Sequence, residues 1–183
     1  MLKTNKINSK HIDIDKIEQL YNDAFPIDER APFFVLTQKI DENKGILLAF
    51  YDNNDNFIGF GYVIKSEKLC FIFYLAVLPQ YRNQGYGSEM LKIIVKECSP
   101  TVVGLNIEPL DEEATNMSER IRRAKFYERN GFKDLGYKTK DGPLWYEMYS
   151  SGEFFPKETY ISLLEDFFGK EIYHKYVRMF NNE

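Results

Sequence analysis

The chain is poor in the residues from which metal sites and disulfide networks are built. Its 183 residues include two histidines and two cysteines, Cys70 and Cys98. With so few of each, no metal-ligand cluster can be assembled from the usual spacings, and two cysteines make no disulfide framework. We therefore expect no metal site, and we expect both cysteines to be reduced core residues of a cytoplasmic protein.

Long hydrophobic runs and an excess of positive charge are also missing. The longest apolar run, residues 69–79, is far short of the roughly 20 residues that cross a bilayer, and the polar start MLKTNKINSK does not resemble a signal peptide. The net charge is -4, whereas binding to a phosphate backbone usually shows as a basic excess. We expect no membrane partner and no nucleic-acid partner.

What the chain does contain is typical of one packed domain. Hydrophobic residues make up 44% of it, with 15 Phe and 13 Tyr, and the length suits a single core. Apolar periodicity predicts helices over residues 12–25 and up to about residue 40, a hairpin of strands 45–51 and 57–65, and a buried strand at 68–78. It then predicts a helix to residue 98, a strand at 101–107, a helix at 117–130, strands at 132–138 and 144–149, and two amphipathic helices after Pro156.

A glycine-containing loop joins the buried strand to the helix that follows it. Its sequence is RNQGYGS, residues 82–88. Such a loop presents unpaired N–H groups and the positive end of a helix dipole, which suits a phosphate, although a tight turn that merely needs glycine explains it as well. There is no GxxxxGK[ST], and Met90 stands where GxGxxG has its third glycine, so neither a P-loop nor a dinucleotide fingerprint fits.

Two segments together resemble the GNAT (GCN5-related N-acetyltransferase) superfamily. RNQGYG is similar to its arginine/glutamine-x-x-glycine-x-glycine/alanine signature, preceded by LAVLPQYR, and FYERNGF at 126–132 is similar to a second signature about 40 residues downstream. The resemblance covers roughly residues 5–150 and implies an α/β fold with a mixed sheet. We expect a GNAT acetyltransferase domain at 1–152 and a two-helix extension at 153–183, packed on the domain or at a dimer interface.

The resemblance implies acetyl-coenzyme A as the cofactor and an N-acetyltransferase as the function. By position, the loop would hold the pyrophosphate, and the end of the preceding strand would pair with the pantetheine arm. The coenzyme-binding residues implied are Leu75, Ala76, Val77, Arg82, Gln84, Gly85, Tyr86, Gly87 and Ser88.

Acetyl transfer without an acyl-enzyme needs a base for the amine and an acid for the thiolate. Tyr127 matches the tyrosine of the second signature and is the candidate acid; packing in the core is its alternative role. Where some members carry a glutamate this chain has Phe71, so Glu108 is the first candidate base and a water chain the second. Arg120 replaces an asparagine common in the family.

The acceptor would be a primary amine of a small molecule, peptide or protein. Asp28, Glu29 and Arg30 stand in the loop that commonly borders the acceptor site in this family, and the two acidic groups would suit a cationic amine. Helix capping is the alternative for Asp28. Two other functions stay open: a coenzyme-A-binding sensor or scaffold without turnover, and a platform on which the aromatic tail forms a homodimer.

Overall fold

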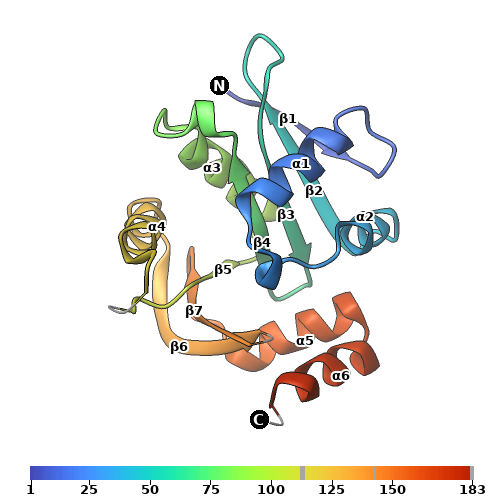
Figure 1. Ribbon diagram of the computed structural model, residues 1–183, viewed down its shortest axis with the longest axis vertical. Helices are drawn as coiled ribbons and strands as arrows, with labels where there is room; N and C mark the ends of the chain where they lie inside the picture. The colour runs from blue at the N-terminus through green and yellow to red at the C-terminus, as the bar shows by residue number, and fades with distance from the viewer. Residues whose placement is uncertain (112–113, 142, 182–183) are drawn as a thin grey trace. The chain divides into compact units, whose positions relative to one another are not determined.

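The computed structural model describes residues 1–111, 114–141 and 143–181, with side chains described as far as residue 175 (Figure 1). The chain forms two compact units. The first comprises residues 1–65 and 72–97, and the second comprises residues 66–71 and 98–183. The strands are hydrogen-bonded in the order β1-β2-β3-β4-β5-β7-β6, which makes a mixed sheet and confirms the predicted fold class.

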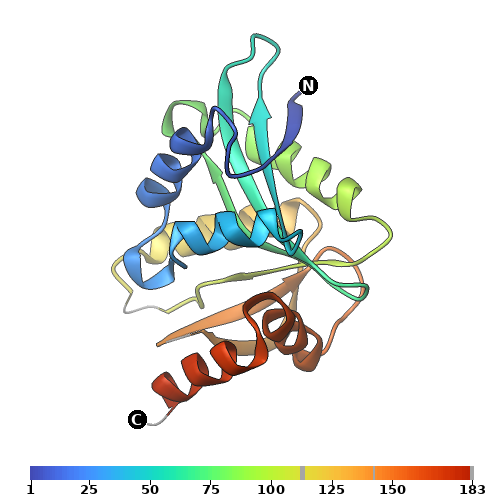
Figure 2. The same cartoon turned by 90° about the vertical axis from the view of Figure 1, so that its right-hand side faces the viewer.

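The first unit begins with an unpredicted edge strand, β1 (Lys3–Ile7). It is followed by α1 (Ile14–Ala24), the short 3-10 helix η1 (Ile27–Glu29), α2 (Phe33–Asp41), β2 (Gly45–Tyr51) and β3 (Phe57–Lys65). Strand β4 (Cys70–Val77), the 3-10 helix η2 (Pro79–Tyr81) and α3 (Tyr86–Cys98) complete it. Figures 1 and 2 show α1 and α2 on one face of β2–β4 and α3 on the other.

Local chemistry explains the β2–β3 hairpin, whose bounds agree with the prediction. The two strands pair antiparallel, and the turn between them is closed by Asp52, whose carboxylate accepts hydrogen bonds from the backbone N–H groups of Asn54 and Asn56. Asp55 has a φ of 62°, a left-handed conformation that Asp and Asn tolerate. Both strands are buried almost throughout, so they form the centre of the first unit.

The second unit contains the first residues of β4, then β5 (Val103–Ile107), α4 (Met117–Arg129), β6 (Lys133–Asp141) and β7 (Leu144–Ser150). Cys70 and Phe71 of β4 pair in parallel with Val103 and Gly104 of β5, as a strand–helix–strand unit requires. Strands β5 and β7 pair antiparallel, as do β6 and β7. Gly131 has a φ of 87° just after α4, the left-handed conformation that glycine commonly adopts at a helix end.

The two helices predicted after Pro156 are present as α5 (Lys157–Phe168) and α6 (Lys170–Asn181), which lie side by side. The apolar side of α5 is buried in the second unit, and the Tyr160 ring packs against that of Phe71 with 4.6 Å between centroids. Helix α5 is therefore part of a core. The division of the chain at residue 152 stays a prediction.

The prediction of reduced cysteines is wrong. Cys70 and Cys98 form a disulfide with a Cα–Cα distance of 6.1 Å, and both are buried. Burial was expected from their apolar surroundings. The bond itself arises because one cysteine begins β4 and the other ends α3, two positions 28 residues apart that the strand–helix–strand connection brings together.

Candidate functional site

The glycine-containing loop lies in the first unit between η2 and α3. Its backbone is left-handed at Asn83, with a φ of 61°, and at Gly85, with a φ of 86°. A Cβ added to Gly85 would meet no atom within 4 Å, so the loop opens onto free space at this residue. Alternation of left-handed residues with others turns successive N–H groups toward one side and produces a concave anion-binding backbone.

Several N–H groups of this loop have no acceptor in the described ranges of the chain. The amides of Ser88 and Glu89 donate to the Gly85 carbonyl at 3.1 and 3.2 Å, which begins α3. No described residue accepts a hydrogen bond from the amides of Gln84, Gly85, Tyr86 or Gly87. These donors stand at the positive end of a 13-residue helix, an arrangement suited to an anion such as a pyrophosphate. The amide of Ser88, also predicted to bind the coenzyme, is already engaged within the turn.

Two side chains brace the loop. Arg82 Nε donates to the Val77 carbonyl at 3.0 Å, and Gln84 Nε2 donates to the Gln80 carbonyl at 2.8 Å. The Arg82 side chain is exposed, and its terminal nitrogens contact no acceptor among the described residues. Arg82 thus ties the loop to the end of β4 and keeps the rest of its guanidinium available to a ligand.

Strand β4 approaches β3 very closely where the pantetheine arm is predicted to bind. A Cβ added to Gly59 of β3 would lie 2.2 Å from the Ala76 carbonyl oxygen, so only glycine fits there. The next link between the strands is the hydrogen bond from the Leu78 amide to the Ile58 carbonyl, at 2.9 Å. Ala76 is buried, while Leu75 and Val77 are half-buried. The end of β4 is therefore fixed by its neighbour.

The segment predicted to border the acceptor is held against β4 by tyrosine hydroxyls. Tyr74 Oη donates to the Glu29 carbonyl at 3.1 Å and accepts from the Ala31 amide at 3.0 Å. Tyr21 Oη donates to the Ala31 carbonyl at 2.8 Å, and burial raises the pKa of Tyr21 above its ordinary value. Asp28 is exposed inside η1, whose N-cap position is Pro26, so Asp28 is not the capping residue of this helix.

Glu108, the candidate base, follows β5 in the second unit and is surrounded by donors. Its carboxylate lies 2.9 Å from Arg120 and 2.7 Å from Arg123, and it accepts a hydrogen bond from Asn116 at 3.2 Å. Arg120 also donates to the Pro109 carbonyl at 2.8 Å. Each oxygen of the Glu108 carboxylate therefore contacts a guanidinium group. Its role as base stays a prediction that these contacts weigh against.

Tyr127, the candidate acid, is half-buried on α4 between two aromatic rings. The Phe126 ring lies 5.1 Å away and the Phe132 ring 5.9 Å away, so a packing role is present whatever else the residue does. Burial raises the pKa of the Tyr127 hydroxyl, and Arg123 opposes that shift. The hydroxyl makes no hydrogen bond within the described part of the chain. It therefore keeps its proton at neutral pH and has it free to donate.

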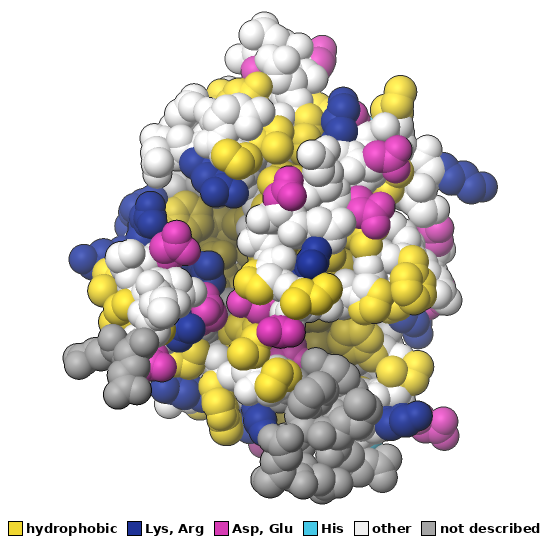
Figure 3. Space-filling model, in the orientation of Figure 1, with side chains coloured by type: hydrophobic (Ala, Val, Ile, Leu, Met, Phe, Trp, Pro, Cys, Tyr) yellow, Lys and Arg dark blue, Asp and Glu magenta, His cyan; other side chains and the backbone are white. Residues whose placement is uncertain are grey.

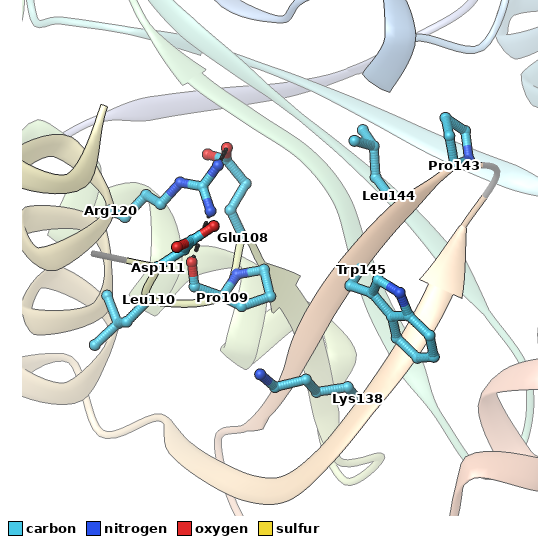
Figure 4. Close-up of a pocket in the computed structure, with 9 residues that line it drawn as sticks. All are labelled: Glu108, Pro109, Leu110, Asp111, Arg120, Lys138, Pro143, Leu144 and Trp145. Carbon is cyan, nitrogen blue, oxygen red and sulfur yellow. Dashed lines mark hydrogen bonds and ion pairs between the residues drawn. The ribbon is translucent and has the colours of Figure 1, made fainter. Parts of the chain in front are cut away.

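A pocket of about 690 Å³ lies in the second unit (Figure 4). Arg120 and Glu108 point toward each other on one side, while Trp145 and Lys138 lie on the other. The Trp145 side chain is 53% exposed. The pocket could not be predicted from the sequence, because Lys138 and Trp145 belong to no recognised motif. They come near Glu108 and Arg120 only through the pairing of β5, β6 and β7.

The predicted site residues thus fall into two groups. Those for the coenzyme and the acceptor lie in the first unit on β4, the loop and the α1–α2 connection, whereas Glu108 and Tyr127 lie in the second. No group of three or more metal-type side chains is placed to hold an ion in the described ranges. None of the described helices combines the length and apolarity needed to cross a membrane.

A family model described as the acetyltransferase (GNAT) domain matches residues 42–134, half of the chain. The chain belongs to the GNAT family. This membership confirms the resemblance inferred from the two signatures, both of which lie inside the matched range.

A curated relative is YjbC of Bacillus subtilis (strain 168), a proposed acetyltransferase. It is 32% identical over 79 residues, which cover 42% of this chain. The matched stretch spans only 38% of the length of that relative.

Solved GNAT structures share the fold. A proposed acetyltransferase of the GNAT family from Bacteroides thetaiotaomicron has a TM-score of 0.71 at 22% identity, covering 93% of this chain and 98% of its own. A spermidine N-acetyltransferase from Vibrio cholerae, solved with CoA and spermine, has a TM-score of 0.63 at 13% identity, covering 81% and 94%. An aminoglycoside 6'-N-acetyltransferase complexed with coenzyme A has a TM-score of 0.62 at 14% identity, covering 81% and 95%. At these identities the likeness shows the fold.

Proposed function

We propose that this GNAT protein transfers an acetyl group from acetyl-coenzyme A directly to a primary amine. The observation that carries the proposal is the loop at the start of α3, where the amides of Gln84, Gly85, Tyr86 and Gly87 point to no acceptor within the described chain. The open space at Gly85 lets a phosphate approach the backbone. Bound coenzyme supplies an activated acetyl thioester, and the chain's residues position it and manage the protons.

The residues of the first unit orient the coenzyme in this proposal. The loop amides and Arg82 hold the pyrophosphate, and the main chain of Leu75, Ala76 and Val77 pairs with the pantetheine arm. The close approach of β3 at Gly59 keeps this edge of β4 in place. A fixed donor such as the Val77 amide lowers the barrier when charge develops on the thioester oxygen.

Proton transfer is assigned to Tyr127 and to water. Tyr127 donates the proton that the departing sulfur needs, since burial keeps its hydroxyl protonated at neutral pH. The amine proton leaves through a water chain, because Glu108 is engaged by Arg120 and Arg123. Glu108 then acts as the anion that fixes the two arginines rather than as the base.

Turnover is the direct test. The purified protein is mixed with acetyl-coenzyme A and a panel of amines that includes spermidine and an aminoglycoside, the acceptor types named for the solved neighbours, and free thiol is measured over time. We expect amine-dependent thiol release, abolished by Gly85→Asp. Gly136→Asp is the matched control, because Gly136 of β6 also has a positive φ of 74° and open space around its Cα.

A second candidate function is a coenzyme-A-binding sensor or scaffold. The observation that favours it is the occupied carboxylate of Glu108, which leaves no free base at that position. Coenzyme binding, with no thiol released from acetyl-coenzyme A in the presence of any amine of the panel, would support the sensor and contradict the enzyme. The cytoplasmic location is likewise a proposal, and reduced cysteines no longer support it because Cys70 and Cys98 are bonded.

Homodimer formation through the tail stays a proposal, and the structure changes its test. Removing residues 155–183 would expose the core, because Phe155 and Tyr160 are buried. Removing α6 alone, residues 170–183, is the better variant. Light scattering of the full chain and of this variant should show a dimer and a monomer if α6 forms the interface, and two equal masses if it does not.

A further inference from the structure

Arg30 is a half-buried cation without a counter-ion among the described residues. One terminal nitrogen of its guanidinium donates to the main-chain oxygen of Asn22 at 3.4 Å and to the side-chain oxygen of the same residue. Its Nε–H is buried and has no hydrogen-bond partner within the described part of the chain. No carboxylate of the described chain forms an ion pair with it, although Asp28 and Glu29 precede it. A half-buried charge without an anion beside it is costly, and an anion from outside the chain that contacts the solvent-facing part of the guanidinium would offset that cost.

The backbone around Arg30 is held in place. Tyr74 Oη bonds the residues on either side of it, through the Glu29 carbonyl and the Ala31 amide, and Tyr21 Oη bonds the Ala31 carbonyl. The rings of Tyr21 and Tyr74 pack edge to face with centroids 4.8 Å apart. With Asn22 holding one end of the guanidinium, Arg30 is preorganised, and little freedom is lost when a ligand binds.

The same contacts place Arg30 beside β4, the strand that is proposed to pair with the pantetheine arm of the coenzyme. Tyr74 immediately precedes Leu75, Ala76 and Val77 on β4, all within the first unit. Exposed apolar side chains flank Arg30 in sequence, with Ile27 73% and Phe34 70% exposed. Figure 3 shows this face, which carries α1 and α2, with hydrophobic side chains exposed beside charged ones. An acceptor that binds at this segment would contact the Arg30 guanidinium and the exposed apolar side chains of Ile27 and Phe34.

We propose that Arg30 binds an anionic group of the acceptor, a carboxylate or a phosphate on the same molecule as the amine that is acetylated. The inference rests on the proposed function. It adds an anion contact to the prediction that Asp28 and Glu29 suit a cationic amine, and it is supported by the half-buried Arg30 guanidinium, which no carboxylate of the described chain neutralises. A guanidinium provides two parallel donors for either anion.

Binding is tested without turnover, using the protein saturated with coenzyme A. Calorimetric titrations compare two matched pairs of amines: L-lysine with 1,5-diaminopentane, and phosphoethanolamine with ethanolamine. We expect the anionic member of one pair to bind roughly 10- to 100-fold more tightly, the range that one hydrogen bond to a charged group supplies. A difference within the lysine pair would identify the preferred anion as a carboxylate, and a difference within the ethanolamine pair would identify it as a phosphate. Equal affinities within both pairs would overturn the inference.

Variants assign the preference to Arg30. Arg30→Gln should remove most of the difference within the responsive pair and leave the affinity for the member without an anionic group unchanged. Arg30→Lys should retain part of it, because the charge stays while the paired donors are lost. Lys65→Gln, at an exposed lysine of the same unit, is the control and should behave as the wild type. A full preference retained in a folded Arg30→Gln protein would contradict the assignment.

The same amines with acetyl-coenzyme A separate the two proposals. Tighter binding of the anionic member without acetylation of any amine would contradict the proposed acetyltransferase activity and support the anion site at Arg30. Acetylation of both members with equal kcat/KM would support the enzyme and refute the anion site.

Discussion

Replacing Glu108 by alanine tests whether its carboxylate is a structural anion or a catalytic base. The Glu108 side chain is 13% exposed and lies 2.9 Å from Arg120, itself 18% exposed. A hydrogen bond to a charged group in such surroundings contributes about 1.5–3 kcal/mol. The pair with Arg123, at 2.7 Å, contributes about 0.2–1 kcal/mol because Arg123 is 41% exposed and solvent screens it. Glu108→Ala should therefore lower the free energy of unfolding by about 2–4 kcal/mol.

Urea unfolding followed by circular dichroism measures this change. Glu119→Ala is the control, because the Glu119–Arg122 pair is 4.0 Å apart with both side chains more than 60% exposed, and its loss should cost within about 0.5 kcal/mol. The second measurement is the turnover rate of the isosteric Glu108→Gln variant relative to that of the wild type. A structural anion predicts a loss of less than roughly tenfold, whereas a base predicts roughly 10² to 10⁴.

The outcome that would refute the structural role is specific. It is a Glu108→Ala protein as stable as the wild type, combined with a loss of roughly 10² or more in the turnover of Glu108→Gln. A loss of the acidic limb of the pH–rate profile in that variant would then identify Glu108 as the base.

Three further predictions follow from the structure. Tyr127→Phe should lower kcat by a factor of roughly 10 to 10⁴ and leave coenzyme affinity unchanged. An unaltered rate would mean that Tyr127 has only a packing role. Reducing the Cys70–Cys98 disulfide, which closes 28 residues, should destabilise the fold by about 3–4 kcal/mol in urea; thiols that label before reduction would contradict the bond. Burial raises the pKa of Tyr137 and Tyr149 to about 12, while tyrosine in the unfolded chain ionises near pH 10. The free energy of unfolding should fall from about pH 10 to 12, because only the unfolded state loses those protons; urea midpoints equal at pH 9 and 11 would contradict this.

Features with local causes could be predicted from the sequence. The β2–β3 hairpin follows from two apolar runs around an Asp- and Asn-rich turn, and the bounds of both strands agree with the prediction. The loop at 82–88 could be found because its glycines and the following helix are adjacent in the chain. The anion-binding character of its amides is likewise a local property of a helix start.

Features that depend on distant residues could not be predicted. Strand β1 was missed because KTNKI is polar and exposed on an edge, and only its pairing with β2 identifies it. The disulfide requires the start of β4 and the end of α3 to meet. The contacts of Glu108 depend on the packing of α4 beside β5. The absence of a counter-ion for Arg30 among the described residues can be seen only once Asn22 and Tyr74 are placed.

The central claim is that the loop at the start of α3 binds the pyrophosphate of acetyl-coenzyme A. Calorimetric titration of the purified protein with acetyl-coenzyme A, with NAD as the control ligand, tests it most directly. The account predicts saturable binding of acetyl-coenzyme A alone, lost in Gly85→Asp and kept in Gly136→Asp. No binding by the wild type, or equal binding by both variants, would mean that the glycines serve only a turn.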